Sequence, residues 1–136
     1  MTDLDFPITI YHNPGCGTSR NTVAMVRAVG YAPLVIDYLQ TGWTRDLIRG
    51  LAERAGLSIR GLMRKKGSPA EALGLLADDV SDDRVLDAML AHPVLVNRPI
   101  VVTPKGVKLC RPSEVVFDLL ERRPTRFVKE DGEIVS

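Results

Sequence analysis

The chain has 136 residues and a mass of 15.0 kDa, with 45% hydrophobic and 26% charged residues. A chain of this size is enough for a single domain over residues 1–136, with an ordinary hydrophobic core and no need for stabilising metals or disulfides. Its 18 basic and 17 acidic residues give a net charge of +1, so no global electrostatic argument favours nucleic acid or an anionic membrane as a partner.

The sequence also favours a cytoplasmic protein. Its apolar runs are far shorter than the roughly 20 residues that span a bilayer. Residues 1–5 are acidic, whereas a signal peptide begins with basic residues. The two cysteines, Cys16 and Cys110, are widely separated. In a reducing compartment such a pair is more typical of reactive or buried thiols than of a structural disulfide.

The first segment is predicted to form a strand, a helix and a second strand. Alternating β-branched and aromatic residues predict a strand over residues 8–11, which ends at the turn-forming run HNPG over residues 12–15. Apolar residues at helical spacing predict a helix over residues 18–29, closed by Gly30. An apolar run predicts the second strand over residues 34–39, parallel to the first through a right-handed crossover.

The middle third of the chain is predicted to be helical. Thr44 and Ser68 suit N-cap positions, because their side-chain oxygens can accept from free N–H groups of the first turn, and Ser81 opens another expected helix. These helices cover residues 44–55, residues 58–64, a short stretch from residue 68, and residues 81–91.

The last third is predicted to contain a hairpin and a helix. Strands over residues 100–103 and 107–110 flank a turn with proline and glycine. Pro112 suits the first position of an amphipathic helix that runs to about residue 120. From about residue 122 the chain is polar, and we expect an extended tail. The order of these elements is typical of the thioredoxin-like α/β fold, in which helices cover a mixed four-stranded sheet.

In such a fold Cys16 lies at the N-terminus of the first helix. The positive end of the helix dipole and the free N–H groups there stabilise a thiolate, so Cys16 is a candidate nucleophile. His12, at the end of the first strand, could reach the sulfur, and a charged imidazole would lower the pKa of the thiol further. The alternative is a surface thiol without a function.

The motif around Cys16 is C-x-x-S, because Ser19 stands where a dithiol oxidoreductase has its second cysteine. Any second sulfur must therefore come from outside, most simply from glutathione or a glutaredoxin. Ser19 could donate a hydrogen bond to the thiolate or to a bound oxyanion, or could be an ordinary residue of the first helical turn. The oxyanion loop C-x-x-x-x-x-R is excluded, since Thr22 occupies the arginine position. Cys110 is interpreted as a buried, small apolar residue rather than a resolving thiol.

Arginines that could bind an oxyanion lie instead in other segments. Arg98 and Arg111 flank the predicted hairpin, and each is next to a proline that restricts its backbone. Arg64 lies at the end of the second predicted helix of the middle third. Each of the three could also be an ordinary surface charge. Two cysteines and two histidines at these spacings do not form a zinc motif, so no metal site is expected.

Three segments closely resemble the glutathione/glutaredoxin-coupled arsenate reductases. They are YHNPGCGTSRNT over residues 11–22, SIRGLMRK over residues 58–65, and NRPIVVTPKGVKLCRPSE over residues 97–114. The resemblance extends over about residues 8–120, and the combination is far more specific than a cysteine after a strand.

The resemblance implies an oxidoreductase of arsenical resistance with a thioredoxin-like fold. Arsenate would be the substrate, glutathione the co-substrate and glutaredoxin a protein partner, with no tightly bound cofactor and a monomeric state. It also implies roles for individual residues, with Pro99 as the cis-proline of the fold. These roles are Cys16 as nucleophile, His12 and Ser19 in the site around it, and Arg64, Arg98 and Arg111 as the oxyanion-binding residues.

Two alternatives remain at this point. A monothiol reductase acting on disulfides or other oxyanions could share the fold, although disulfide exchange does not need three arginines. A redox-responsive transcription regulator of the same fold, without enzymatic activity, is the other alternative. Regulators that switch by oxidation use C-x-x-C, and Ser19 argues against that mechanism.

Overall fold

The computed structural model describes residues 6–135, so the acidic residues 1–5 lie outside the described part. The chain forms two compact units. The first combines the described parts of residues 1–37 and 98–136, and the second consists of residues 38–97. That the two units make up one domain stays a prediction.

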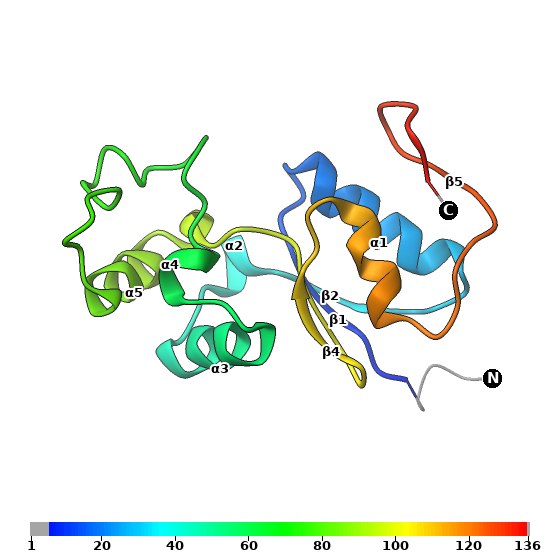
Figure 1. The fold of residues 1–136 in the computed structure, drawn as a ribbon, viewed down its shortest axis with the longest axis horizontal. Helices are drawn as coiled ribbons and strands as arrows, with labels where there is room; N and C mark the ends of the chain where they lie inside the picture. Colours follow the sequence, from blue (N-terminus) through cyan, green and yellow to red (C-terminus); the bar gives the residue numbers. More distant parts are fainter. Residues whose placement is uncertain (1–5, 136) are drawn as a thin grey trace. The chain divides into compact units, whose positions relative to one another are not determined.

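The first unit contains a mixed four-stranded sheet in the order β2-β1-β3-β4 (Figure 1). β1 (Thr9–His12) runs parallel to β2 (Leu34–Asp37) and antiparallel to β3 (Ile100–Thr103). β3 forms the predicted hairpin with β4 (Gly106–Leu109). The structure therefore confirms the predicted α/β fold with its mixed sheet.

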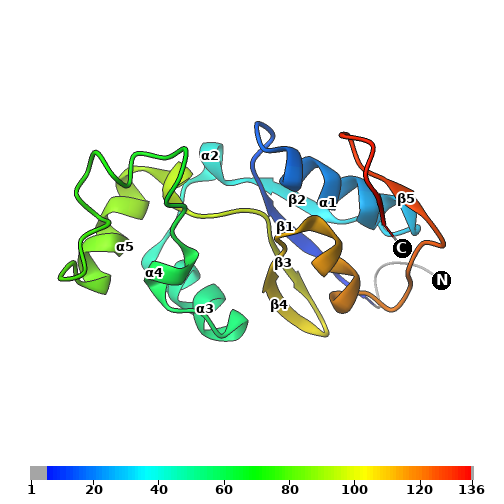
Figure 2. The same cartoon turned by 45° about the horizontal axis from the view of Figure 1, so that its top comes forward.

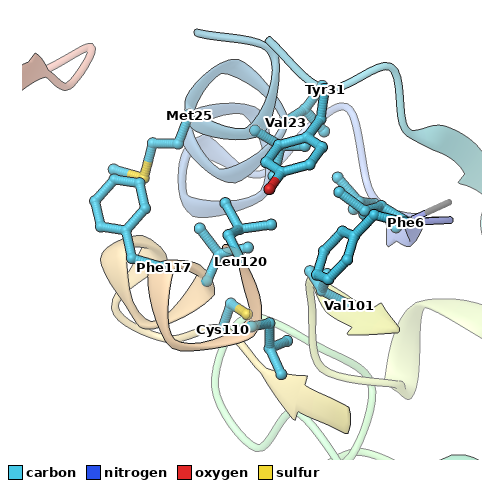
Figure 3. Close-up of a cluster of buried hydrophobic side chains, with 13 residues drawn as sticks. Phe6, Val23, Met25, Tyr31, Val101, Cys110, Phe117 and Leu120 are labelled. Atoms are coloured by element: carbon cyan, nitrogen blue, oxygen red, sulfur yellow. The ribbon is translucent and has the colours of Figure 1, made fainter. Parts of the chain in front are cut away.

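Helix α1 (Gly17–Ala28) and the 3₁₀ helix η3 (Ser113–Leu119) supply the apolar side chains that cover this sheet. A helix was predicted after Pro112, but its pitch is 3₁₀, with hydrogen bonds such as Leu120 N–H to Phe117 O at 3.2 Å. The apolar pattern predicted which residues are buried, not the pitch. Figure 3 shows the resulting core cluster, which includes Phe6, Ile10, Val23, Met25, Val26, Tyr31, Val101, Cys110, Phe117 and Leu120.

The second unit is helical, as predicted, and Figure 2 labels α2 (Tyr38–Thr41), α3 (Arg45–Ala55), α4 (Ile59–Leu62) and α5 (Asp82–Ala91). A 3₁₀ turn, η2 (Pro93–Leu95), follows α5. Thr44 and Ser81, at the predicted helix starts, and also Ser58 each accept a hydrogen bond from a backbone N–H of the first helical turn.

The structure corrects two predictions here: the strand from residue 34 is present but shorter than predicted, and one short helix is absent. The strand after residue 34 ends at Asp37, because Tyr38 begins α2 and its buried hydroxyl donates to the carbonyl of Val96 at 2.8 Å. The short helix from residue 68 is absent, and turns take its place. Gly74 adopts φ +73°, and the Arg60 guanidinium donates to the carbonyls of Leu75, Ala77 and Val80 at 3.2, 2.9 and 2.9 Å. The left-handed Gly74 cannot continue a right-handed helix, and the Arg60 guanidinium satisfies carbonyls that follow it.

The C-terminal segment also differs from the expected extended tail. It folds back as a two-stranded antiparallel hairpin of β5 (Phe127–Val128) and β6 (Ile134–Val135), red in Figure 1. The polar sequence from residue 122 gave no indication of this pairing, because each strand has only two residues.

Candidate active site

The register of the strands brings three chain segments to the same end of the sheet, where β1 and β4 end and β3 begins. Tyr11 on β1 is opposite Ile100 on β3, and Ile100 is opposite Leu109 on β4. β1 therefore ends where β3 begins and where β4 ends. The loop that carries Cys16 follows the end of β1. Arg98 lies just before β3, and Arg111 lies just after β4.

The loop before α1 is fixed by its own backbone and by Asn13. The Cys16 N–H donates to the carbonyl of Asn13 at 3.0 Å, and the Cys16 carbonyl accepts from Arg20 N–H at 3.0 Å, which makes Cys16 the N-cap residue of α1. The buried Asn13 side chain accepts from Gly15 N–H at 2.8 Å. Cys16 thus lies at the positive end of the helix dipole, as the sequence predicted.

Two arginines surround the sulfur within the first unit. Arg111 Nη1 lies 3.7 Å from Cys16 Sγ and also donates to the Arg98 carbonyl at 2.9 Å. The Arg98 side chain is itself buried, with 7% of the residue exposed. The peptide bonds Arg98–Pro99 and Arg111–Pro112 are both cis. The first of these is the cis-proline that the resemblance implied.

The pKa of the Cys16 thiol lies below its ordinary value. Partial burial alone would raise this pKa, but three interactions outweigh it. The backbone N–H of Ser19 contributes most, followed by the guanidinium groups of Arg111 and Arg98. The arrangement therefore favours a thiolate, which is the nucleophilic form of cysteine.

A pH titration of alkylation checks this electrostatic effect. Only the thiolate reacts with iodoacetamide, so the rate constant for modifying Cys16 should reach half its maximum at a lower pH than for a free cysteine. The depressed pKa also means that the charged site stabilises the fold above the free-thiol pKa and that this contribution is lost as the pH falls through the folded-state pKa. A midpoint at or above that of a cysteine peptide would contradict the prediction.

His12 and Ser19 form a hydrogen-bonded pair next to the loop. His12 Nδ1 lies 2.5 Å from Ser19 Oγ, and Ser19 Oγ accepts from Asn13 N–H at 3.1 Å. Ser19 is fully buried. Since Ser19 Oγ already accepts from Asn13, its hydroxyl proton is available for a neutral imidazole nitrogen.

The pKa of His12 lies below its ordinary value, mainly because the imidazole is partly buried. Asp37 opposes this effect, while Arg20 and Arg27 add to it. The imidazole is therefore neutral at pH 7, and the positive charge beside Cys16 comes from arginines rather than from His12. Catalysis by His12 stays a prediction.

Arg64 belongs to the second unit. Its backbone N–H donates to the Leu95 carbonyl at 2.7 Å, and its Nη1 lies 3.4 Å from Asn97 Oδ1. Met63 and Val96 form an isolated antiparallel bridge beside it. Arg64 is thus held against the stretch that leads into Arg98 in the sequence, and its approach to the oxyanion stays a prediction.

Cys110 is fully buried in the core cluster of Figure 3, as the sequence predicted. Burial raises the pKa of its thiol to about 12, so it remains protonated at pH 7. Its sulfur lies 3.7 Å from the Lys108 carbonyl.

Replacing Cys110 by alanine should leave turnover within about twofold of the wild type, because the thiol takes no part in the chemistry. The free energy of unfolding, measured with urea, should fall by about 1 kcal/mol through the lost apolar contact. Loss of turnover in a folded variant would instead indicate a resolving cysteine.

Residues 6–135 contain no helix that could span a membrane and no group of three side chains suited to hold a metal ion. The sequence prediction did not include Asn13, Arg20 and Glu130, which surround the Cys16 loop in the structure. Asn13 could have been recognised from the turn-forming tendency of its residue type. Glu130 is 110 positions from Arg20, and no local pattern predicts that contact.

A cysteine at a helix N-cap with a lowered pKa, a cis-proline and a four-stranded mixed sheet define a thiol-dependent enzyme of thioredoxin-like fold. Residues 11–119 match the model of the ArsC family. The chain is 57% identical to an arsenate reductase of Escherichia coli and 55% identical to arsenate reductase ArsI2 of Synechocystis, in each case over 94% of this chain and 92% of the relative. The protein belongs to the ArsC family.

Solved structures agree with this assignment. The arsenate reductase from Vibrio cholerae superimposes with a TM-score of 0.80 at 39% identity, covering 85% of this chain and 98% of the other. A putative arsenate reductase from Yersinia pestis gives a TM-score of 0.77 at 40% identity, covering 82% and 98%.

Proposed function

We propose that this protein is an arsenate reductase that uses Cys16 as its nucleophile. The observation that carries the proposal is the 3.7 Å approach of Arg111 to the Cys16 sulfur, in a chain 57% identical to an arsenate reductase. One guanidinium can favour the thiolate and also bind an arsenate oxygen, so the same charge serves both reactants. Arg98, and Arg64 by the family resemblance, are the further residues proposed to bind the oxyanion.

The first chemical step forms a bond between Cys16 sulfur and arsenic. The thiolate attacks As(V) and an arsenate oxygen leaves as hydroxide, which takes up a proton to become water. Arsenic keeps its oxidation state in this step. The neutral His12 and the Ser19 hydroxyl bonded to it belong to the surroundings of the reacting sulfur and can hold or pass a proton.

The second step transfers two electrons. A glutathione thiolate forms a disulfide bond with Cys16 sulfur, the sulfur–arsenic bond breaks, and its electron pair reduces As(V) to As(III), released as arsenite. Glutaredoxin then reduces the Cys16–glutathione disulfide. Electrons from glutathione make a tightly bound cofactor unnecessary, and the enzyme acts as a monomer in the cytoplasm, where glutathione stays reduced.

A coupled assay tests this function. Purified protein is mixed with arsenate, glutathione, glutaredoxin and glutathione reductase, and NADPH oxidation is followed while each component is omitted in turn. Turnover should require arsenate, glutathione and glutaredoxin. NADPH oxidation that proceeds on a small disulfide but never on arsenate would favour the monothiol disulfide reductase instead.

Phosphate should compete with arsenate, because it has the same charge and nearly the same shape. Selectivity then comes from the reactivity of arsenic toward sulfur rather than from binding. Millimolar phosphate should raise the KM for arsenate and leave kcat unchanged. An unchanged KM would contradict an arginine site for tetrahedral oxyanions.

A further inference from the structure

The C-terminal hairpin is anchored on η3 by a lysine. The Lys129 side chain is 8% exposed, and its Nζ lies 2.8 Å from Glu114 Oε1 and 3.2 Å from Glu133 Oε1. Glu114 belongs to η3, which follows Arg111 and Pro112 in the chain. Ion pairs that are shielded from water are screened less than exposed ones and so attract more strongly. The hairpin turn is therefore fixed in place on the first unit.

The next residue of the hairpin, Glu130, contacts α1. Its carboxylate accepts two hydrogen bonds from Arg20, from Nε at 2.9 Å and from Nη2 at 2.9 Å. Its backbone N–H donates to Asn21 Oδ1 at 3.0 Å. Figures 1 and 2 both show the hairpin beside α1. A paired, planar contact of this kind fixes the orientation of the guanidinium.

The remaining nitrogen of Arg20 contacts the loop that carries Cys16. Nη1 donates to the Pro14 carbonyl at 2.9 Å. The N–H of the same peptide unit, on Gly15, donates to Asn13 Oδ1 at 2.8 Å. Both polar groups of the Pro14–Gly15 peptide are thus held by side chains, and this peptide immediately precedes Cys16.

We propose that Arg20 and Glu130 are positioning residues for Cys16, through which the C-terminal hairpin sets the orientation of the Pro14–Gly15 peptide. Glu130 orients the Arg20 guanidinium, and Arg20 holds the Pro14 carbonyl. With that peptide fixed, Cys16 stays at the N-cap position, where its sulfur meets the Ser19 N–H and Arg111. All three guanidinium nitrogens of Arg20 are engaged by Glu130 and the Pro14 carbonyl, so the proposed role is positioning and not oxyanion binding.

The contribution is to geometry rather than to stability. The Arg20 and Glu130 side chains are 44% and 49% exposed, and exposed ion pairs stabilise a fold only slightly. Variants at either position should therefore fold normally. Small displacements of a reacting atom, by contrast, reduce rates strongly.

Glu130→Gln provides a test, because a purely electrostatic effect and a loosened loop predict opposite changes in the pKa of Cys16. Removing a negative charge near Cys16 would, by electrostatics alone, lower the pKa of the thiol. A loosened loop would instead weaken the contacts of the thiolate and raise that pKa. We expect the pH midpoint of iodoacetamide alkylation to rise by about half a unit, and kcat for arsenate to fall about tenfold with KM within about twofold.

Asp118→Asn is the matched control. Asp118 pairs with Arg123 at 3.0 Å and with Lys108 at 3.5 Å, its side chain is 50% exposed, and it belongs to the same unit. Asp118→Asn removes the same charge from a similarly exposed position. The pH midpoint of alkylation and kcat for arsenate should both stay at their wild-type values. Arg20→Gln should reproduce the effect of Glu130→Gln on kcat.

A midpoint that falls or stays unchanged in Glu130→Gln, together with an unchanged kcat in Arg20→Gln, would overturn the proposal. The kcat readout rests on the proposed arsenate reduction, whereas the alkylation readout does not. If the wild type did not reduce arsenate, a raised midpoint would still support the positioning role, so the two failures are distinguishable.

Discussion

Replacing Cys16 by serine should reduce arsenate-dependent NADPH oxidation to the rate measured without enzyme, a loss of at least about 10³-fold. A serine hydroxyl does not ionise near neutral pH, even beside Arg111 and the N-terminus of α1. It also has no sulfur with which to form a disulfide with glutathione. Both chemical steps therefore fail at the same residue.

The matched control for this variant is Cys110→Ala, which removes the protein's other thiol from the core and should keep turnover. Circular dichroism should show that Cys16→Ser folds like the wild type, because the residue caps α1 through its backbone and makes no side-chain capping bond. Residual arsenate-dependent activity well above background would show that Cys16 is not the nucleophile.

Replacing Arg111 by glutamine should lower kcat/KM for arsenate about 10²-fold, which corresponds to about 2.7 kcal/mol of transition-state stabilisation. The change removes the positive charge 3.7 Å from Cys16 Sγ. The pH midpoint of Cys16 alkylation should rise as well, since the Arg111 contact lowers the pKa of the thiol.

Arg111→Lys separates charge from geometry. Lysine keeps the charge but does not provide a planar group that contacts the Arg98 carbonyl and the sulfur together. The alkylation midpoint should return toward the wild-type value while kcat/KM recovers only in part. Arg111→Gln with unchanged alkylation and turnover would exclude Arg111 from the site.

Local signals in the sequence predicted most of the fold. Thr44, Ser58 and Ser81 begin helices because their side chains bond the N–H groups of the next turn, a rule that needs no tertiary information. The same rule predicted a short helix from residue 68, and that prediction was wrong. There the Arg60 guanidinium binds carbonyls 15 to 20 positions away, and a local pattern contains no information on such a contact.

In the candidate site, too, local sequence predicted some features, whereas others depend on contacts between distant parts of the chain. The place of Cys16 between a strand and a helix was evident from residues near it in the chain. The approach of Arg111, 95 positions away, could be inferred only from the family resemblance. The role of the arginines was clear from charge, whereas the neutral state of His12 depends on its burial, which the sequence does not specify.

The sheet joins strands that are far apart in the sequence, so the ribosome makes the parts of the site at different times. β1 pairs with β3, and residues 38–97 lie between the two halves of the first unit. On the ribosome, Cys16 therefore emerges long before Arg98, Arg111 and Glu130. The contribution of the Ser19 N–H is local to α1, whereas the contributions of Arg111 and Arg98 to the lowered pKa of Cys16 require segments that are made later. The thiol therefore reaches its full acidity, and with it its full reactivity, only once the segments on both sides of residues 38–97 have been made.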